Sequence, residues 1–178
     1  SHAFPTRRYS DLSGEIIFKE AKKNPKNIYI GIEYYRRGVA QLLKKIDDHD
    51  LKNIQIFHGD AHVFLKEISK FFFDEIWIFF PDPWPKKRHE KRRFIQIASI
   101  NRLYEILKPD GKLYISSDDK SYISWILSLI FQSDKFEWLA ESPFDWKNPY
   151  REYYGSRYEE KGMKKNRPPY FLKFKKTD

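Results

Sequence analysis

Short runs of β-branched and aromatic residues alternate along the chain with segments whose apolar positions recur at helical spacing. The strand-like runs are residues 28–32, 54–57, 75–80 and 112–116. The helix-like segments that follow them are residues 36–46, 61–68, 92–107 and 122–131. This alternation predicts an α/β fold with a mostly parallel, doubly wound sheet and helices on both of its faces.

Three predicted strands have distinctive positions in that sheet. Residues 75–80 are apolar on both faces, which is typical of a central parallel strand. Near the end of the chain, the apolar segments 136–139 and 170–174 are expected to pair as an antiparallel hairpin at the sheet edge.

Acidic residues follow the carboxyl ends of the predicted strands. In chain order they are Glu33, Asp60, Asp82 and the pair Asp118 and Asp119. Any one of them also suits a helix N-cap. Ligands of open α/β sheets bind outside these strand ends, however, and an acid there can take both hydroxyls of a nucleotide ribose. Four acidic strand ends at one edge therefore predict a ligand site.

The charge balance adds a candidate partner. The chain carries 34 Lys+Arg against 25 Asp+Glu, a net charge of +9 and a pI of about 9.5. Such a surface attracts polyanions, although a genome-wide bias toward lysine, isoleucine and asparagine would give the same totals. The distribution of the charges along the chain has to decide between the two.

Several classes of protein are excluded or disfavoured by composition. The absence of cysteine excludes a disulfide scaffold, a thiolate zinc site and a cysteine nucleophile. The longest apolar run, residues 76–80, is far shorter than the roughly 20 residues of a membrane-spanning helix. His58 and His62 are four residues apart, but a Gly-Asp turn lies between them and no third ligand recurs, so no metal is expected. A cytoplasmic protein of one domain, without a signal peptide, is the expectation.

Residues 80–93, FPDPWPKKRHEKRR, are the most informative segment. Three prolines in five residues stiffen the backbone around Asp82 and Trp84. Six of the next eight residues are Lys or Arg. Basic side chains hold a nucleic acid by its backbone, and an aromatic ring stacks on an exposed base. Basic residues at a helix start oppose the helix dipole and cost stability. A loop with a purely structural role would not be expected to carry that cost, so the run favours RNA binding.

The same segment resembles the signature of the bacterial tRNA (guanine-N7-)-methyltransferase family of the TrmB type. Further matches run in the family's order from about residue 13 to 175. They are GIE at residues 31–33, GDA at 59–61, SD followed by Tyr122 at 117–118, and SRYE at 156–159. The chain is therefore identified as a member of this family.

The resemblance implies a class I S-adenosylmethionine-dependent methyltransferase fold, as a monomer or homodimer. It implies methyl transfer to N7 of a guanine at position 46, in the variable loop of tRNA. By motif position, Asp82 is the catalytic acid. The expected cofactor residues are Glu33, Asp60, Asp82 and Gly14. The expected substrate contacts are Lys86, Asp118, Ser156, Arg157, Tyr158 and Glu159. The expected contacts to the RNA backbone are Lys87, Arg88, Lys91, Arg92 and Arg93.

One departure from the family pattern is large. Class I methyltransferases open with an apolar strand and a glycine-rich turn, but no two glycines here stand in G-x-G spacing. We therefore expect residues 1–12 to be a basic N-terminal arm and residues 13–178 a single methyltransferase domain. The first strand and the glycine-rich turn would be missing between Leu12 and Ser13. Either the sequence omits that segment, or the protein lacks it and is a catalytically inactive RNA-binding relic.

Aromatic and basic residues near the C-terminus have weaker patterns. Trp125, Trp138 and Trp146 have apolar neighbours and are expected to pack in the core. Tyr150 either packs or lines the path of the tRNA. The basic and aromatic tail, residues 161–176, is expected to contact RNA.

Overall fold

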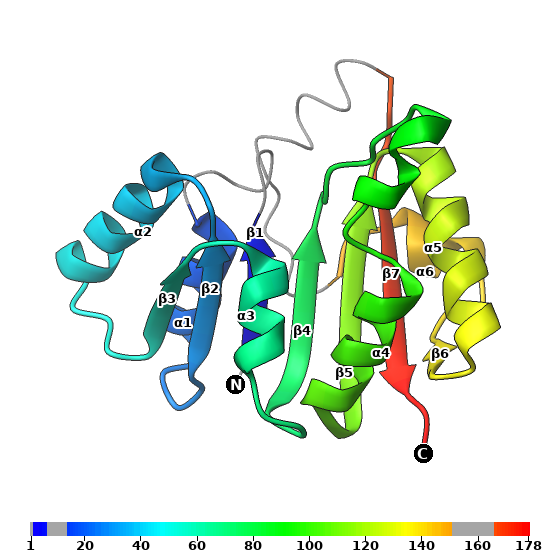
Figure 1. Cartoon of the computed structure of the whole chain (residues 1–178). Helices are drawn as coiled ribbons and strands as arrows, with labels where there is room; N and C mark the ends of the chain where they lie inside the picture. The colour runs from blue at the N-terminus through cyan, green and yellow to red at the C-terminus, as the bar shows by residue number, and fades with distance from the viewer. Residues whose placement is uncertain (1, 7–13, 151–165) are drawn as a thin grey trace.

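The computed structural model describes residues 2–6, 14–150 and 166–178, with the backbone alone for residues 2–6 (Figure 1). Its centre is a seven-stranded sheet of order β3-β2-β1-β4-β5-β7-β6. The strands are β1 (His2–Thr6), β2 (Tyr29–Glu33), β3 (Ile54–His58), β4 (Phe73–Phe79), β5 (Leu107–Ser117), β6 (Phe136–Trp138) and β7 (Tyr170–Lys176). Strands β1 to β5 pair in parallel, while β7 is antiparallel to both β5 and β6. The predicted fold class and edge hairpin are confirmed.

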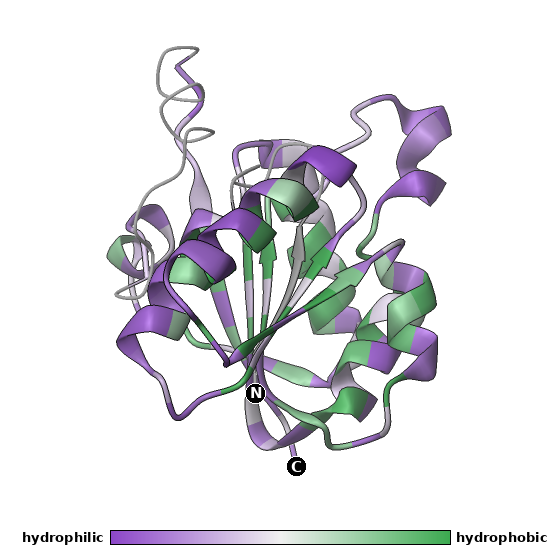
Figure 2. Cartoon of the chain, turned by 90° about the vertical axis from the view of Figure 1, so that its left-hand side faces the viewer, coloured by the Kyte–Doolittle hydropathy of each residue, from purple (hydrophilic) through white to green (hydrophobic). Residues whose placement is uncertain are grey.

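Helices cover both faces of the sheet. They are α1 (Glu15–Lys23), α2 (Arg36–Asp48), α3 (Ala61–Glu67), α4 (Ile97–Ile106), α5 (Lys120–Ser133), α6 (Pro143–Lys147) and the 3₁₀ helix η1 (Lys87–Arg92). One buried apolar cluster joins α3, α4 and α5 to one face of the sheet, and a second joins α1 and α2 to the other. Figure 2 shows the apolar strands enclosed between helices whose outer surfaces are polar. Among the described residues, none of the helices combines the length with the apolar character that a membrane span requires.

Strand β1 differs from the sequence prediction. Residues 2–6 were expected in a basic arm outside the domain, with the first strand missing. They instead form the strand between β2 and β4, with Thr6 in register with Glu33 on one side and Phe79 on the other. The buried backbone groups of β2 and β4 need partners between them, and residues 2–6 supply these. The predicted position of the glycine-rich turn, around residues 12 and 13, lies outside the described residues.

The basic segment also differs from the expected single helix over residues 92–107. The 3₁₀ helix η1 ends at Arg92, and α4 begins only at Ile97. The interruption has a physical cause, because the backbone N–H of Ile95 donates to the hydroxyl of Tyr122 at 3.1 Å. Gln96 then starts α4 through a capping box with Ser99.

Candidate active site

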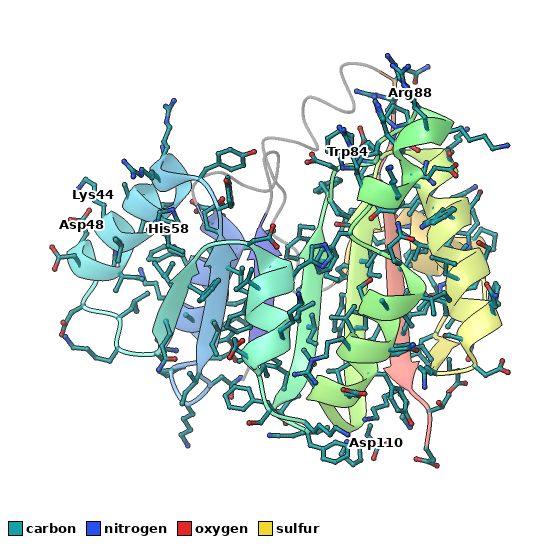
Figure 3. The ribbon with its side chains drawn as sticks, in the orientation of Figure 1. Lys44, Asp48, His58, Trp84, Arg88 and Asp110 are labelled. Atoms are coloured by element: carbon teal, nitrogen blue, oxygen red, sulfur yellow. The ribbon has the colours of Figure 1, made fainter. Side chains whose placement is uncertain are left out.

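The carboxyl ends of the parallel strands lie along one edge of the sheet, the upper edge in Figure 3. Trp84, in the loop after β4, and Arg88, on η1, are at this edge, whereas Asp110 lies at the opposite one (Figure 3). Open α/β sheets bind their ligands at this edge. The sequence-predicted acids lie at or just after the ends of four of these strands, and the structure gives them different environments.

Glu33, at the end of β2, is buried, with 5% of its surface exposed. Its Oε1 accepts a hydrogen bond from the backbone N–H of Tyr35 at 2.8 Å. Gly38, in the first turn of α2, lies directly against the same carboxylate. A Cβ at Gly38 would be 2.7 Å from Oε2 of Glu33, so any larger residue there would force the carboxylate to shift. The carboxylate is therefore fixed in direction at the end of β2.

Asp60, after β3, caps a helix, which is the second role that the sequence analysis considered for these acids. It is exposed, and its carboxylate accepts from the backbone N–H of His62 at 2.6 Å. This contact makes Asp60 the N-cap of α3. A cap fixes the side chain at the strand end, where a ligand lying along the edge can still reach it.

Asp82 lies in a turn that is strained on both sides. Phe80 and Trp84 have φ angles of 45° and 43°, a region in which a bulky side chain is an outlier. Each such residue costs on the order of 1–3 kcal/mol, and such strain clusters at functional sites. The backbone N–H of Phe80 donates to the carbonyl of Ser116 at 2.9 Å, which fixes the start of the turn to β5. Asp82 itself is half-buried.

Asp118 and Asp119, after β5, have different roles, because only Asp119 caps a helix. Asp119 accepts from the backbone N–H of Tyr122 at 2.8 Å and caps α5. Asp118 is buried, and its Oδ2 lies 3.7 Å from Nε of Arg167, whose side chain is half exposed. Asp118 is therefore the acid of this strand end that does not begin a helix.

Exposed basic side chains lie beside the Asp82 turn and form what we call the η1 basic patch. Its members are Lys86, Lys87, Arg88, Lys91 and Arg92. The guanidinium of Arg92 lies over the indole of Trp84, 5.0 Å from the ring centroid, and the His89 ring meets the indole edge-on. The patch thus presents cations and one aromatic platform together, as expected for an RNA-binding surface.

Arg93 does not belong to this patch, which corrects its sequence assignment as a contact to the RNA backbone. Only 2% of its surface is exposed. Its Nε donates to the carbonyl of Pro83 at 2.8 Å, so the side chain turns inward under the loop. A guanidinium in that position has no access to a phosphate in solution.

The remaining predicted residues are placed as follows. Gly14 is the N-cap of α1 and has a left-handed φ of 63°, which favours glycine. The expected substrate contacts Ser156, Arg157, Tyr158 and Glu159 lie outside the described residues. Within the part of the chain that the structure describes, no three His, Asp or Glu side chains are grouped as metal ligands.

The structure tests two expectations for the C-terminal region, the packing of its aromatic residues and the RNA contact of its tail. Trp125, Trp138 and Trp146 pack against the core cluster, as predicted, and Tyr150 also packs, because its hydroxyl donates to backbone carbonyls of β5 and β7. In the tail, Lys176 is buried and its Nζ donates to the carbonyls of Tyr104 and Leu107. For Lys176, the expectation of RNA contact is wrong.

Comparison with known proteins adds independent findings. A family model described as "Putative methyltransferase" matches residues 12–172. The chain is 38% identical over 163 residues to the tRNA (guanine-N(7)-)-methyltransferase of Bartonella henselae, covering 90% of this chain and 70% of that protein. It is 37% identical over 161 residues to the enzyme of the same name from Agrobacterium fabrum, covering 90% and 69%.

Solved structures with the same fold are more distant in sequence. An rRNA methylase from Streptococcus thermophilus matches with a TM-score of 0.63 at 12% identity, covering 100% of this chain and 87% of that one. A SAM-dependent O-methyltransferase from Thermotoga maritima matches with a TM-score of 0.62 at 14% identity, covering 99% and 59%. At such identities, these matches show a shared fold and nothing further.

Proposed function

The chain belongs to the family of bacterial tRNA (guanine-N7-)-methyltransferases, and on that premise we propose that it methylates N7 of a guanine in tRNA. The methyl donor is S-adenosylmethionine, in keeping with the class I methyltransferase fold. The acceptor is guanine 46 of the variable loop, and the enzyme works in the cytoplasm as a monomer or homodimer.

One observation carries this proposal: a rigid acid lies between a row of acidic strand ends and an exposed cationic patch. Asp82 is held in a strained turn. Glu33 at the end of β2 and Asp60 just after β3 lie to one side of it, and η1 lies on the other. The acidic strand ends suit the adenosine of the cofactor, and the η1 basic patch suits phosphates. A methyl group bound from one side would meet a base held from the other.

The described residues at the cofactor side fit S-adenosylmethionine. Glu33 is a buried carboxylate with one oxygen fixed by Tyr35, and Gly38 leaves room for it. Such a carboxylate would accept hydrogen bonds from both ribose hydroxyls of the cofactor. Asp60, at the same edge of the sheet, would contact its adenine. Gly14, at the start of α1, lies at the N-terminal end of the helix that follows β1. The group supplies an electrophilic methyl when bound.

The chemistry asks for alignment more than for proton transfer. N7 of guanine carries a free lone pair, so no base has to deprotonate it before attack. Holding the nucleophile in line with the methyl group contributes several kcal/mol through proximity and orientation. Methylation places positive charge on the imidazole ring of guanine, and a fixed Asp82 carboxylate stabilises that charge as it develops.

Asp118 has a different role in the proposal. A carboxylate accepts well from the N1–H and the exocyclic amine of guanine, as acids do with donors on base edges. Asp118 follows β5, the neighbour of β4 in the sheet, and is the acid of that strand end that does not cap a helix. We assign it to hold the base while Asp82 faces the reacting ring.

The test is transfer of a labelled methyl group to unmodified tRNA, followed by digestion and mass identification of the nucleoside. We expect 7-methylguanosine from the wild-type protein and a loss of at least ~100-fold in transfer for Asp82→Asn, with tRNA affinity unchanged. Asp110→Asn is the matched control, because Asp110 is an exposed acid at the opposite sheet edge (Figure 3). Full transfer by Asp82→Asn would contradict the assignment.

A second candidate function, an inactive RNA-binding relic, is favoured by one observation: the sequence has no G-x-G spacing. The same assay decides between the two functions. Salt-sensitive tRNA binding without any 7-methylguanosine would identify the relic, whereas the product itself would exclude it.

A further inference from the structure

We propose that Arg93 is the positioning residue for the Asp82 turn, locking it to the start of α5 and therefore to Asp118. The inference rests on the proposed function, because it concerns how that active site is held. The sequence predicts that Arg93 contacts RNA, but its side chain is buried and its guanidinium contacts other residues of the protein.

The first step is the contact to the turn itself. Nε of Arg93 donates to the carbonyl of Pro83 at 2.8 Å. Pro83 lies between Asp82 and Trp84, and Trp84 has the positive φ of 43°. A strained backbone persists only where surrounding contacts fix it. The Arg93 hydrogen bond is a contact of this kind, made to the peptide group between Pro83 and Trp84.

The second step is how Arg93 is itself held. Its guanidinium carbon lies 5.3 Å from the ring centroid of Tyr122 and 5.0 Å from that of Trp125, both on α5. Nη2 is 3.5 Å from Oγ of Ser121, and Nη1 is 3.6 Å from a carboxylate oxygen of Glu90 on η1. A planar guanidinium between aromatic rings is more restricted than an ammonium would be.

The third step connects this cluster to the other acid. Tyr122 donates its backbone N–H to Asp119, the residue after Asp118. The Tyr122 hydroxyl and the Trp125 indole N–H also bind the backbone N–H and carbonyl of Ile95. The chain just after Arg93 is therefore fixed to the first turns of α5. The Asp82 turn and the Asp118 strand end are joined through one buried arginine.

The consequence is a requirement for arginine at this position that neither charge nor volume alone satisfies. Arg93→Lys keeps the positive charge but has no donor at the Nε position. Arg93→Met keeps the aliphatic stem and removes every polar contact. A misplacement of about 1 Å in a catalytic group can cost ~100-fold in rate. We expect kcat to fall at least ~10-fold in both variants, with KM for tRNA within about threefold.

Arg102→Lys is the matched control. Arg102, on α4, also binds backbone carbonyls, those of Leu65 and Ile68, and pairs with Glu105. It serves the far end of α3 and not the Asp82 turn. We expect a similar loss of thermal stability to that of Arg93→Lys but an unchanged kcat. Amide hydrogen exchange supplies the second readout: the amides of Asp82, Trp84 and Lys86 exchange faster only in the Arg93 variants.

The outcomes separate the inference from the function it rests on. A fall in kcat and faster exchange in the Arg93 variants alone support the inference. A normal kcat in those variants, or a salt-dependent rise in the tRNA Kd with kcat unchanged, overturns it, and an equal fall of kcat in Arg102→Lys does so too. If the wild-type protein makes no 7-methylguanosine, the proposed function fails first, and slow exchange of the turn in Arg93→Lys would then overturn the structural part as well.

Discussion

The η1 basic patch leads to a quantitative prediction about salt. Replacing Lys87, Arg88 and Lys91 with glutamine removes three of its five exposed cations and leaves Arg92 on Trp84. Each phosphate contact contributes about 0.9 to the slope of log affinity against log salt on a duplex. Five contacts therefore predict a loss of about 500-fold in tRNA affinity between 50 and 200 mM salt, and two contacts a loss of only about 12-fold.

The matched control removes the same charge from the opposite edge of the sheet. Lys22, Lys23 and Lys26 are exposed at the end of α1 and beyond it. Their replacement with glutamine changes the net charge equally but touches no part of the proposed site. The assay is fluorescence anisotropy with labelled tRNA over 50 to 200 mM KCl. Equal slopes for the two triple variants would refute the reasoning, because the binding would then follow net charge and not the patch.

Three further predictions test other contacts. Gly38→Ala pushes a Cβ against the carboxylate of Glu33, so calorimetry should show at least ~10-fold weaker S-adenosylmethionine binding with unchanged tRNA affinity; equal binding would contradict the cofactor role. The hydrogen bond from Lys45 holds the pKa of Glu15 below its ordinary value of 4.5. Its stabilisation is therefore present above pH 4.5 and lost as the pH falls through the lowered pKa; the Tm difference between wild type and Lys45→Met should shrink over that range, and a constant difference would count against the pair. Lys176→Met leaves the buried carbonyl of Leu107 and the partly buried carbonyl of Tyr104 without their Nζ donor and should cost about 1–3 kcal/mol in urea unfolding, with the salt dependence of tRNA binding unchanged; an altered salt slope would instead restore Lys176 to the RNA surface.

Most of the fold could be predicted from the alternation of patterns, and the exceptions have local causes. Residues 2–6 are a short run that contains Pro5 and precedes two arginines. This local pattern does not predict a central strand. Residues 2–6 become a central strand because β2 and β4 both need a hydrogen-bonding partner between them. That requirement is a property of the whole sheet. The helix start at Ile97 was likewise set by contacts from α5, 27 residues away in sequence.

The candidate site shows the same limit. Glu33 ends β2 and Asp60 comes just after β3, and only the structure distinguishes the buried acid beside Gly38 from the exposed helix cap. Arg93 is the last of six basic residues, and no local signal separates it from the other five. Its neighbours Tyr122 and Trp125 come from α5. Long-range packing, not local composition, therefore decides which cation of the motif faces inward.

The central claim is that N7 of guanine accepts the methyl group, and an acceptor lacking that atom tests it most directly. The measurement compares methyl transfer to a tRNA carrying guanosine at position 46 with transfer to one carrying 7-deazaguanosine there. The two tRNAs differ by one ring atom and keep the same base-edge donors. We predict 7-methylguanosine from the first, and no transfer but equal binding with the second. Undiminished transfer to the 7-deaza substrate would contradict the account.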